Sequence, residues 1–106
     1  MVYELRRYVA APGKADALLH RFEHGTLAIF ARAGIRIEHF WRDRDRPGDV
    51  VYVCAFADDA AREAAWKAFG ADPAWHALKA ETERDGPLTV SMTSELLVPI
   101  LGFPRA

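Results

Sequence analysis

The sequence predicts an α+β fold in which a four-stranded antiparallel sheet carries two helices on one face, in the order βαββαβ. Three observations lead to this prediction. Apolar residues alternate with a period of two in several segments, and they follow a helical period in the segments between them. Stretches rich in proline and glycine separate these segments. Residues 50–57 are apolar on both faces, as expected of a strand in the centre of a sheet.

The first half of the chain predicts a strand, a long helix and a second strand. Residues 2–9 are rich in β-favouring side chains and end before a Pro-Gly pair. From residue 14 to 33, apolar side chains follow steps of three and four, which predicts a helix of about five turns. Gly34 lies where a helix C-cap belongs. Residues 35–43 alternate again, and a second Pro-Gly pair then predicts the turn of a hairpin.

The second half repeats this order of elements. After the strand at 50–57, two aspartates precede an alanine-rich helix over 60–69. A break follows, and Asp72 can cap a second helical segment that begins with proline and ends near residue 84. Residues 88–98 are the last strand. This is the ferredoxin-like arrangement, in which the first and third strands are central.

Strand alternation predicts which side chains lie on the sheet face away from the helices. In the first strand these would be Glu4, Arg6 and Tyr8, and the other strands would add more charged and polar residues. The face is either solvated or buried against an identical subunit, and the periodicity favours neither. We expect Glu4, Arg6 and Tyr8 to form ion pairs at the surface or interface, or to bind an anionic ligand between subunits.

Composition indicates one globular domain over residues 1–106. Of these residues 51% are hydrophobic and 27% charged, and the net charge is −1, which gives no electrostatic footprint for nucleic acid or an anionic membrane. No apolar run approaches the roughly 20 residues of a membrane span, and the first residues do not resemble a signal peptide. Cys54 has no disulfide partner, so we expect a cytoplasmic protein. The excess of arginine over lysine suggests a bacterial source.

The segment from His20 to His24 matches the H-x-x-E-H motif of inverted zinc peptidases. On a helix, however, both histidines lie opposite the apolar stripe and point to solvent. No third ligand is suggested nearby. We therefore expect no metal site and no cofactor.

A small apolar pocket is expected between the helices and the sheet. His39 shares a predicted strand face with Ile35, Ile37 and Trp41, which would direct it toward the helices. Such a histidine is usually a core residue, and the alternatives are a general base, a hydrogen-bonding group or a haem ligand. The helix break before Pro73 leaves space beside several aromatic side chains. The predicted pocket residues are Tyr3, Trp41, Tyr52, Trp66 and Phe69, with His39 as the proton-transfer group.

Several blocks of the sequence together resemble the NIPSNAP family from end to end. They are Tyr3-Glu4-Leu5-Arg6-x-Tyr8, Gly34-Ile35, Trp66-x-x-Phe69-x-x-Asp72-Pro73-x-Trp75 and Leu96-Leu97-x-Pro99. The third block is the most specific. The resemblance implies the dimeric α/β-barrel form of the fold, in which two subunits pack sheet against sheet. It implies no catalytic residues, and His39 lies where the family pattern leads us to expect a small side chain.

Two functions are compatible with this resemblance. Families of related fold include cofactor-free monooxygenases, haem enzymes and isomerases, which favours a homodimer that binds or converts a small apolar or aromatic ligand. Eukaryotic relatives are associated with protein interaction, so the alternative is a non-catalytic interaction module. In that case the dimer would present a surface to another protein, on the helix sides that we expect to face solvent, with Arg21, His24, Arg32, Lys67 and Lys79.

Overall fold

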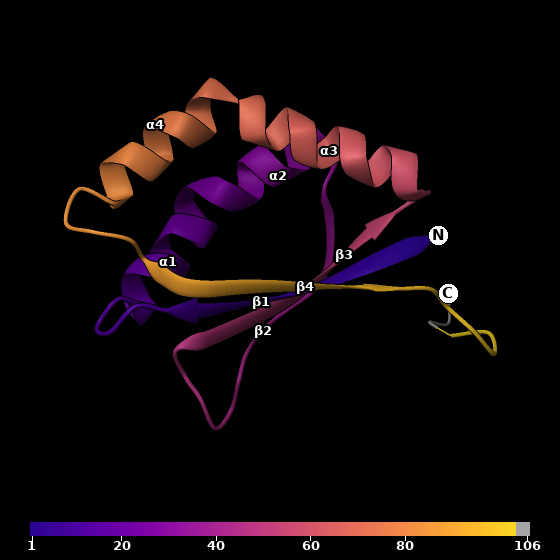
Figure 1. Cartoon of the computed structure of the whole chain (residues 1–106), viewed down its shortest axis with the longest axis horizontal. Helices are drawn as coiled ribbons and strands as arrows, with labels where there is room; N and C mark the ends of the chain where they lie inside the picture. Colours follow the sequence, from indigo (N-terminus) through magenta and orange to yellow (C-terminus); the bar gives the residue numbers. More distant parts are fainter. Residues whose placement is uncertain (104–106) are drawn as a thin grey trace.

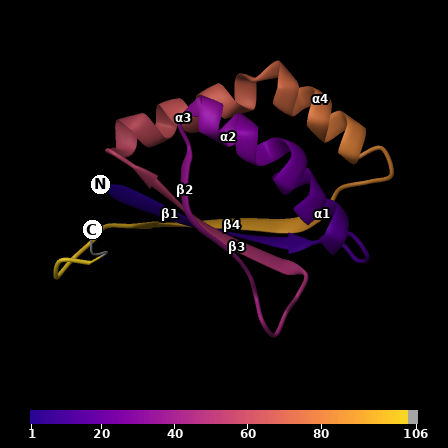
Figure 2. The same ribbon diagram turned by 180° about the vertical axis from the view of Figure 1, so that it is seen from behind.

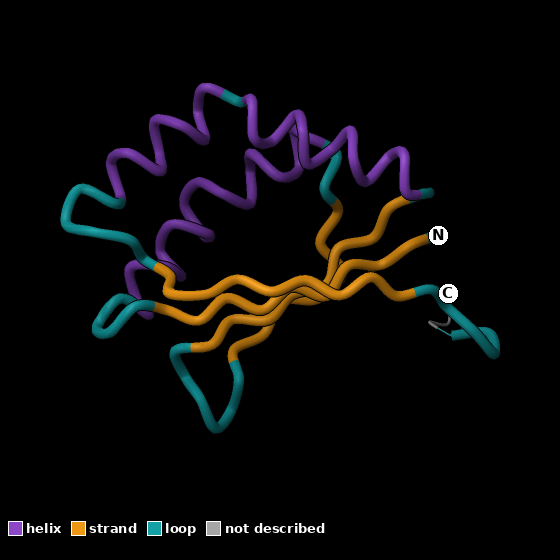
Figure 3. The backbone as a smooth tube through the Cα atoms, in the orientation of Figure 1, coloured by secondary structure: helices purple, strands orange, loops and turns teal. Residues whose placement is uncertain are grey.

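The computed structural model describes residues 1–103, and residues 104–106 of the predicted domain lie outside the described part. The strands form one antiparallel sheet in the order β2-β3-β1-β4, so β1 and β3 are central, as predicted. The strands span Val2–Ala10 (β1), Arg36–Arg42 (β2), Asp49–Phe56 (β3) and Thr89–Leu97 (β4). Figure 3 shows the sheet as one layer and the helices as a second layer above it.

All helices cover the same face of the sheet, and the other face is bare (Figures 1 and 2). The first connection consists of α1 (Ala15–Arg21), a π-helical turn η1 (Phe22–Thr26) and α2 (Leu27–Ala33). The second consists of α3 (Asp59–Ala71) and α4 (Pro73–Thr82), which meet at a bend. The predicted order βαββαβ is therefore confirmed. Among residues 1–103 no helix has the length and apolar character needed to cross a membrane.

The π-helical turn interrupts a helix that the sequence predicts to be regular. It contains Gly25, which lies against α4: a Cβ atom on this residue would be 2.5 Å from Leu78 Cδ2. The Thr26 hydroxyl donates to the carbonyl of Arg21 at 3.3 Å. The turn therefore widens the helix at the point where α4 crosses closely over it.

The ends of the helices follow the predicted capping residues. The Asp58 carboxylate accepts from the amide of Ala61 at 2.7 Å, and the Asp72 carboxylate accepts from the amide of Ala74 at 2.8 Å. Gly34 ends α2 with a φ of 95°, in the left-handed region that favours glycine. These short-range signals fix where the helix layer begins and ends over the sheet.

The core between the layers is mainly aromatic. Phe30 packs edge-on against Phe22, Trp66 and Phe69, and it also contacts Tyr52 of β3. Cys54 is buried beside this cluster, and burial together with the negative charge of Glu4 raises the pKa of its thiol to about 12. The thiol is therefore protonated and unreactive at neutral pH.

A β-bulge in β2 changes the face of the residues that follow it. Ile37 and His39 pair with neighbouring residues of β3, so Glu38 is the extra residue. As a result Phe40 points to the helices and packs on Phe22, whereas His39 and Trp41 point to the bare face. The predicted orientation of His39 and Trp41 toward the helices is wrong, because regular alternation does not include the bulge.

Two glycines allow a direct test of the backbone at helix ends. Gly34→Ala places a side chain at positive φ and should lower the free energy of unfolding by about 1 kcal/mol. Gly70→Ala lies within α3, where nothing is within 4 Å of an added Cβ, and should raise the free energy of unfolding by about 0.5 kcal/mol. Urea denaturation of both variants measures the two changes. A stabilised Gly34→Ala variant would contradict the left-handed cap.

Candidate functional site

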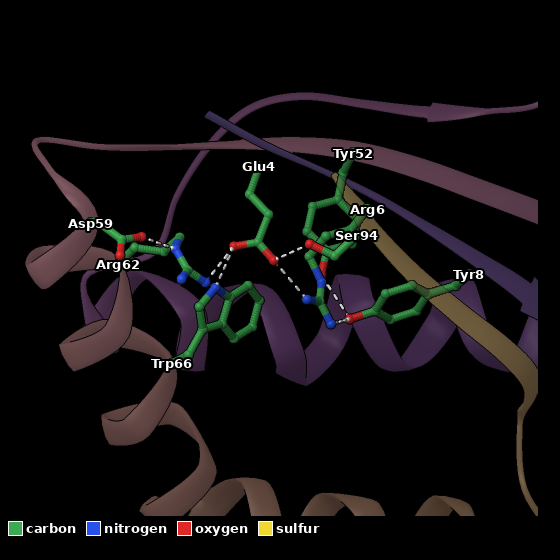
Figure 4. A network of polar contacts seen from close by, with 8 residues as sticks. All are labelled: Glu4, Arg6, Tyr8, Tyr52, Asp59, Arg62, Trp66 and Ser94. Atoms are coloured by element: carbon green, nitrogen blue, oxygen red, sulfur yellow. Dashed lines mark hydrogen bonds and ion pairs between the residues drawn. The ribbon is translucent and has the colours of Figure 1, made fainter. Parts of the chain in front are cut away.

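A buried polar cluster joins β1 to β4 and α3 (Figure 4). Its centre is Glu4, whose side chain is 2% exposed. One carboxylate oxygen accepts from Arg6 Nη1 at 2.9 Å and from Ser94 Oγ at 2.7 Å. The other accepts from Trp66 Nε1 at 2.8 Å and lies 3.6 Å from Arg62 Nη1. The carboxylate is thus fully hydrogen-bonded although it is enclosed by protein.

Arg6 connects this carboxylate to two tyrosine hydroxyls. Its Nε donates to Tyr52 at 3.0 Å and its Nη2 donates to Tyr8 at 3.2 Å. The two hydroxyl oxygens are 2.7 Å apart and share a hydrogen bond. The guanidinium carbon lies 4.3 Å from the ring centroid of Trp66, in a cation–π contact. The side chain of Arg6 therefore contacts a carboxylate, two phenols and an indole at once.

The cluster has a defined charge state at neutral pH. Burial would raise the pKa of the Glu4 carboxyl, but hydrogen bonds from Ser94, Trp66 and Arg6 outweigh burial and hold that pKa below its ordinary value. Burial raises the pKa of Tyr52, and the neighbouring Tyr8 raises it further. Although burial opposes the charge of Arg6, its hydrogen bonds and the tyrosines raise the pKa of the guanidinium. The cluster therefore holds an ion pair and a neutral Tyr52 phenol.

A cavity of about 240 Å³ lies beside the cluster, between the helices and the sheet. Tyr8 belongs to both, so it connects the wall of the cavity to Tyr52 and the polar cluster. The other aromatic walls are Phe22, Phe30, Phe69 and Trp75. Met92 of β4 adds a further apolar side chain. The polar residues lining the cavity are Arg21, Thr26, Lys79, Glu83 and Thr89.

Arg21 is the polar wall residue that sequence analysis placed wrongly. It is 6% exposed instead of facing solvent, because α4 and the residues after it pack over its helix. Its Nη1 donates to Glu83 at 2.8 Å and to Thr82 at 3.2 Å, and its guanidinium lies 5.1 Å from the ring centroid of Trp75. The signal in the sequence is weak: Arg21 comes three residues after Leu18, at the flank of the apolar stripe.

The predicted site residues fall on two different faces of the sheet. Tyr52, Trp66 and Phe69 lie between sheet and helices, as expected, and of these Phe69 lines the cavity. The members on the bare face are Tyr3, Trp41 and His39. The expectation that all six share one pocket is therefore wrong, and the role of His39 in proton transfer stays a prediction.

The predicted location of Glu4, Arg6 and Tyr8 on the bare face is also wrong. They point toward the helices, since Trp66 of α3 donates to Glu4 and Tyr8 packs on Phe22. Alternation separates the two faces of a strand but does not say which one is buried. Charged residues normally mark the solvent face, and here they form a satisfied internal cluster instead.

The bare face carries a second depression, at the end where β4 continues into residues 98–103. It has a volume of about 900 Å³ and is lined by apolar residues of the tail and by sheet residues that include two charged ones: Tyr3, Arg36, Glu38, His39 and Val53. Many of the tail side chains are exposed, with Leu101 at 87% and Val98 at 70%. His39 stacks on Trp41 with ring centroids 5.0 Å apart. We call the whole bare face of the sheet, including this depression, the open face.

The two histidines of the H-x-x-E-H segment lie on the outside of the helix layer. His20 and His24 are exposed, and their ring centroids are 4.3 Å apart. Within residues 1–103 no group of three or more His, Cys, Asp or Glu side chains is arranged to hold a metal ion.

Comparison with known proteins gives one family match and many related structures. The NIPSNAP family model matches residues 3–101. A NIPSNAP domain protein from Burkholderia xenovorans is 27% identical, with 98% of this chain and 99% of that chain covered and a TM-score of 0.85. A NIPSNAP family protein from Agrobacterium tumefaciens is 20% identical, with 99% and 98% covered and a TM-score of 0.86.

A third structure is SnoaB, a cofactor-independent oxygenase from Streptomyces nogalater. It is 21% identical, with 98% of this chain and 97% of that chain covered and a TM-score of 0.67. At this identity the likeness shows a shared fold. The search of curated proteins gives no match.

The charge of Glu4 can be tested through the pH dependence of stability. Glu4→Gln leaves Arg6 without its buried partner and should lower the free energy of unfolding by about 3 kcal/mol at pH 7. The carboxyl pKa is 4.5 when unperturbed and lower in the folded chain. The stabilisation by Glu4 is therefore complete above pH 4.5 and is lost as the pH falls through the folded pKa.

The measurement is urea denaturation of both proteins between pH 7 and pH 3. The difference between wild type and Glu4→Gln should shrink below pH 4.5, because only the wild type gains a proton at this position on unfolding. Asp43 and Asp72, whose carboxyl pKa values are also lowered, affect both proteins equally and cancel in the difference. A difference that is constant over this range would contradict a paired carboxylate.

Proposed function

Because the chain belongs to the NIPSNAP family, we propose that it is a homodimeric domain that binds a small aromatic molecule in the cavity between its helices and its sheet. The observation that carries this proposal is the aromatic lining of a cavity that has a fixed polar wall. Ligand sites typically combine apolar walls with a few positioned polar groups.

The size and shape of the cavity favour a single substituted ring. A cavity of about 150 Å³ with apolar walls accommodates benzene in a well-studied case. The volume of about 240 Å³ leaves room for one or two substituents on such a ring. Edge and face contacts with Phe69 and Trp75, whose own centroids are 4.7 Å apart, suit a planar ligand.

The phenol pair gives the cavity a means of acting on a bound molecule. When Tyr52 donates to Tyr8, the hydrogen of the Tyr8 hydroxyl is available to an oxygen of the ligand. Arg6 holds both phenols, and a positioned donor beside a cation stabilises negative charge that develops on such an oxygen. This arrangement supports a cofactor-independent enzymatic domain of the monooxygenase or isomerase kind, and the structural likeness to SnoaB agrees with it.

The open face supports the homodimer. It has no helix over it, and its exposed apolar residues form a contiguous surface at the end of β4. Patches of this kind mark interaction sites, and a second copy can cover the sheet symmetrically. In this dimer the stacked pair of His39 and Trp41 lies at the interface.

The second candidate is a non-catalytic interaction module, and the apolar tail is the observation that favours it. Residues 98–101 continue beyond the sheet with exposed side chains. In this case the open face binds a different protein, and the chain alone remains monomeric.

Filling part of the cavity should weaken ligand binding. Thr26→Leu adds volume to the wall and should weaken binding of 4-methylphenol about tenfold. The matched control Thr26→Val removes the same hydroxyl without adding volume and should bind within about twofold of the wild type. Saturation-transfer NMR with titration measures both. Equal binding by Thr26→Leu and the wild type would place the ligand elsewhere.

A charge on the open face should separate the subunits. Val53→Asp introduces a carboxylate in the middle of the sheet and should convert the dimer to a monomer in sedimentation velocity, because an unpaired charge is costly to bury. Ala77→Asp makes the same change in charge on the outside of α4 and should remain dimeric. A wild-type monomer at micromolar concentration would favour the interaction module instead.

A further inference from the structure

The guanidinium of Arg21 has an edge that the protein does not use. Both hydrogen-bond partners of its side chain within residues 1–103, Glu83 and Thr82, contact Nη1. Its Nε is fully buried, and it is the one buried side-chain nitrogen or oxygen in the described residues without a partner. The edge formed by Nε and Nη2 therefore lacks an acceptor. Buried donors are nearly always satisfied in folded proteins, so this edge requires an explanation.

The surroundings of this edge point to an anion. Arg21 lines the helix–sheet cavity, where its guanidinium lies over the ring of Trp75 in a cation–π contact. Lys79 of α4 lines the same cavity and forms no ion pair with another described residue. Glu83 is the acidic residue of this lining, and it is already paired with Arg21. The cavity thus has one positive charge in excess at its polar end.

The geometry points to a carboxylate as the group that binds there. Two N–H donors on one edge of a guanidinium match the two oxygens of a carboxylate, which they bind side by side. We propose that the cavity binds an aromatic carboxylic acid, with the ring among Phe22, Phe69 and Trp75 and the carboxylate on the Nε–Nη2 edge of Arg21. Lys79 supplies a second cation at the same end. This inference rests on the proposed function, since it names the ligand class of the same cavity.

The position of Arg21 explains how the cavity selects this class. Arg21 precedes the π-helical turn and is held through Nη1 by the end of α4. Because its orientation is fixed before a ligand binds, little side-chain freedom is lost on binding. A neutral ring of the same size fills the apolar part of the cavity but leaves the free edge without an acceptor.

The first experiment compares two ligands that differ only in charge and acceptor geometry. Benzoate and benzamide are titrated into the wild-type protein at pH 7 and followed by amide chemical shifts. Benzoate should bind at least about tenfold more tightly than benzamide, as expected for a charge-assisted hydrogen bond. Equal affinities would overturn the carboxylate inference while leaving the aromatic cavity intact. If neither compound binds in the cavity, both the inference and the proposed function fail.

The second experiment uses variants to locate the carboxylate. Lys79→Gln should weaken benzoate about threefold without changing benzamide. Lys67→Gln is the matched control, because Lys67 is exposed on α3 and does not line the cavity; it should leave both affinities unchanged. Arg21→Lys keeps the charge but loses the paired donors and should weaken benzoate about tenfold or more.

The outcomes of these variants are distinct. If Arg21→Lys does not fold, the comparison of Lys79→Gln with Lys67→Gln still tests the location, because Lys67 and Lys79 are both exposed. Equal weakening of benzoate by Lys67→Gln and Lys79→Gln would indicate general attraction to positive charge and would overturn the site.

Discussion

The buried carboxylate of Glu4 is the constraint on which the rest of the structure depends. It lies on a central strand and accepts hydrogen bonds from Arg6, from Ser94 of β4 and from Trp66 of α3. A buried charge is tolerated only when such partners are present, so this one carboxylate links the edge strand and the helix layer to the central strand. The same requirement orients Arg6, which in turn positions Tyr8 at the wall of the cavity. The ion pair of Glu4 and Arg6 therefore contributes both to the fold and to the candidate site.

The order of the elements was predictable from sequence because it depends on short-range signals. Periodicity defines strands and helices, and the capping residues Asp58, Asp72 and Gly34 define their ends. The faces of the strands were not predictable in the same way. In β2 one extra residue reverses the alternation, and in β1 the charged face is the buried one. Both errors come from tertiary structure: a partner strand accommodates the bulge, and a distant tryptophan completes the cluster.

The candidate site was predictable in part for the same reason. Phe69 was expected at a pocket because it follows the apolar phase of its helix and precedes the break. Arg21 was missed because its burial depends on α4, which is about 60 residues later in the chain. Gly25 suits the closeness of that contact, since a Cβ atom there would displace the end of the Leu78 side chain. No signal was taken from this glycine, and a regular helix was predicted instead.

Because of the bulge at Glu38, the number of residues in β2 decides which of its side chains lie on each face of the sheet. Ahead of it Ile37 packs against the core, and beyond it the side chains that reach the open face are His39 and Trp41. Loss of one residue here would exchange the partners of every later position in β2, whereas a substitution alters a single side chain. A chain that differed by an insertion or deletion at this point would therefore carry different side chains on the open face, even where its aligned residues were identical. One insertion or deletion in this edge strand can therefore change at once which side chains face the helices and which lie on the open face.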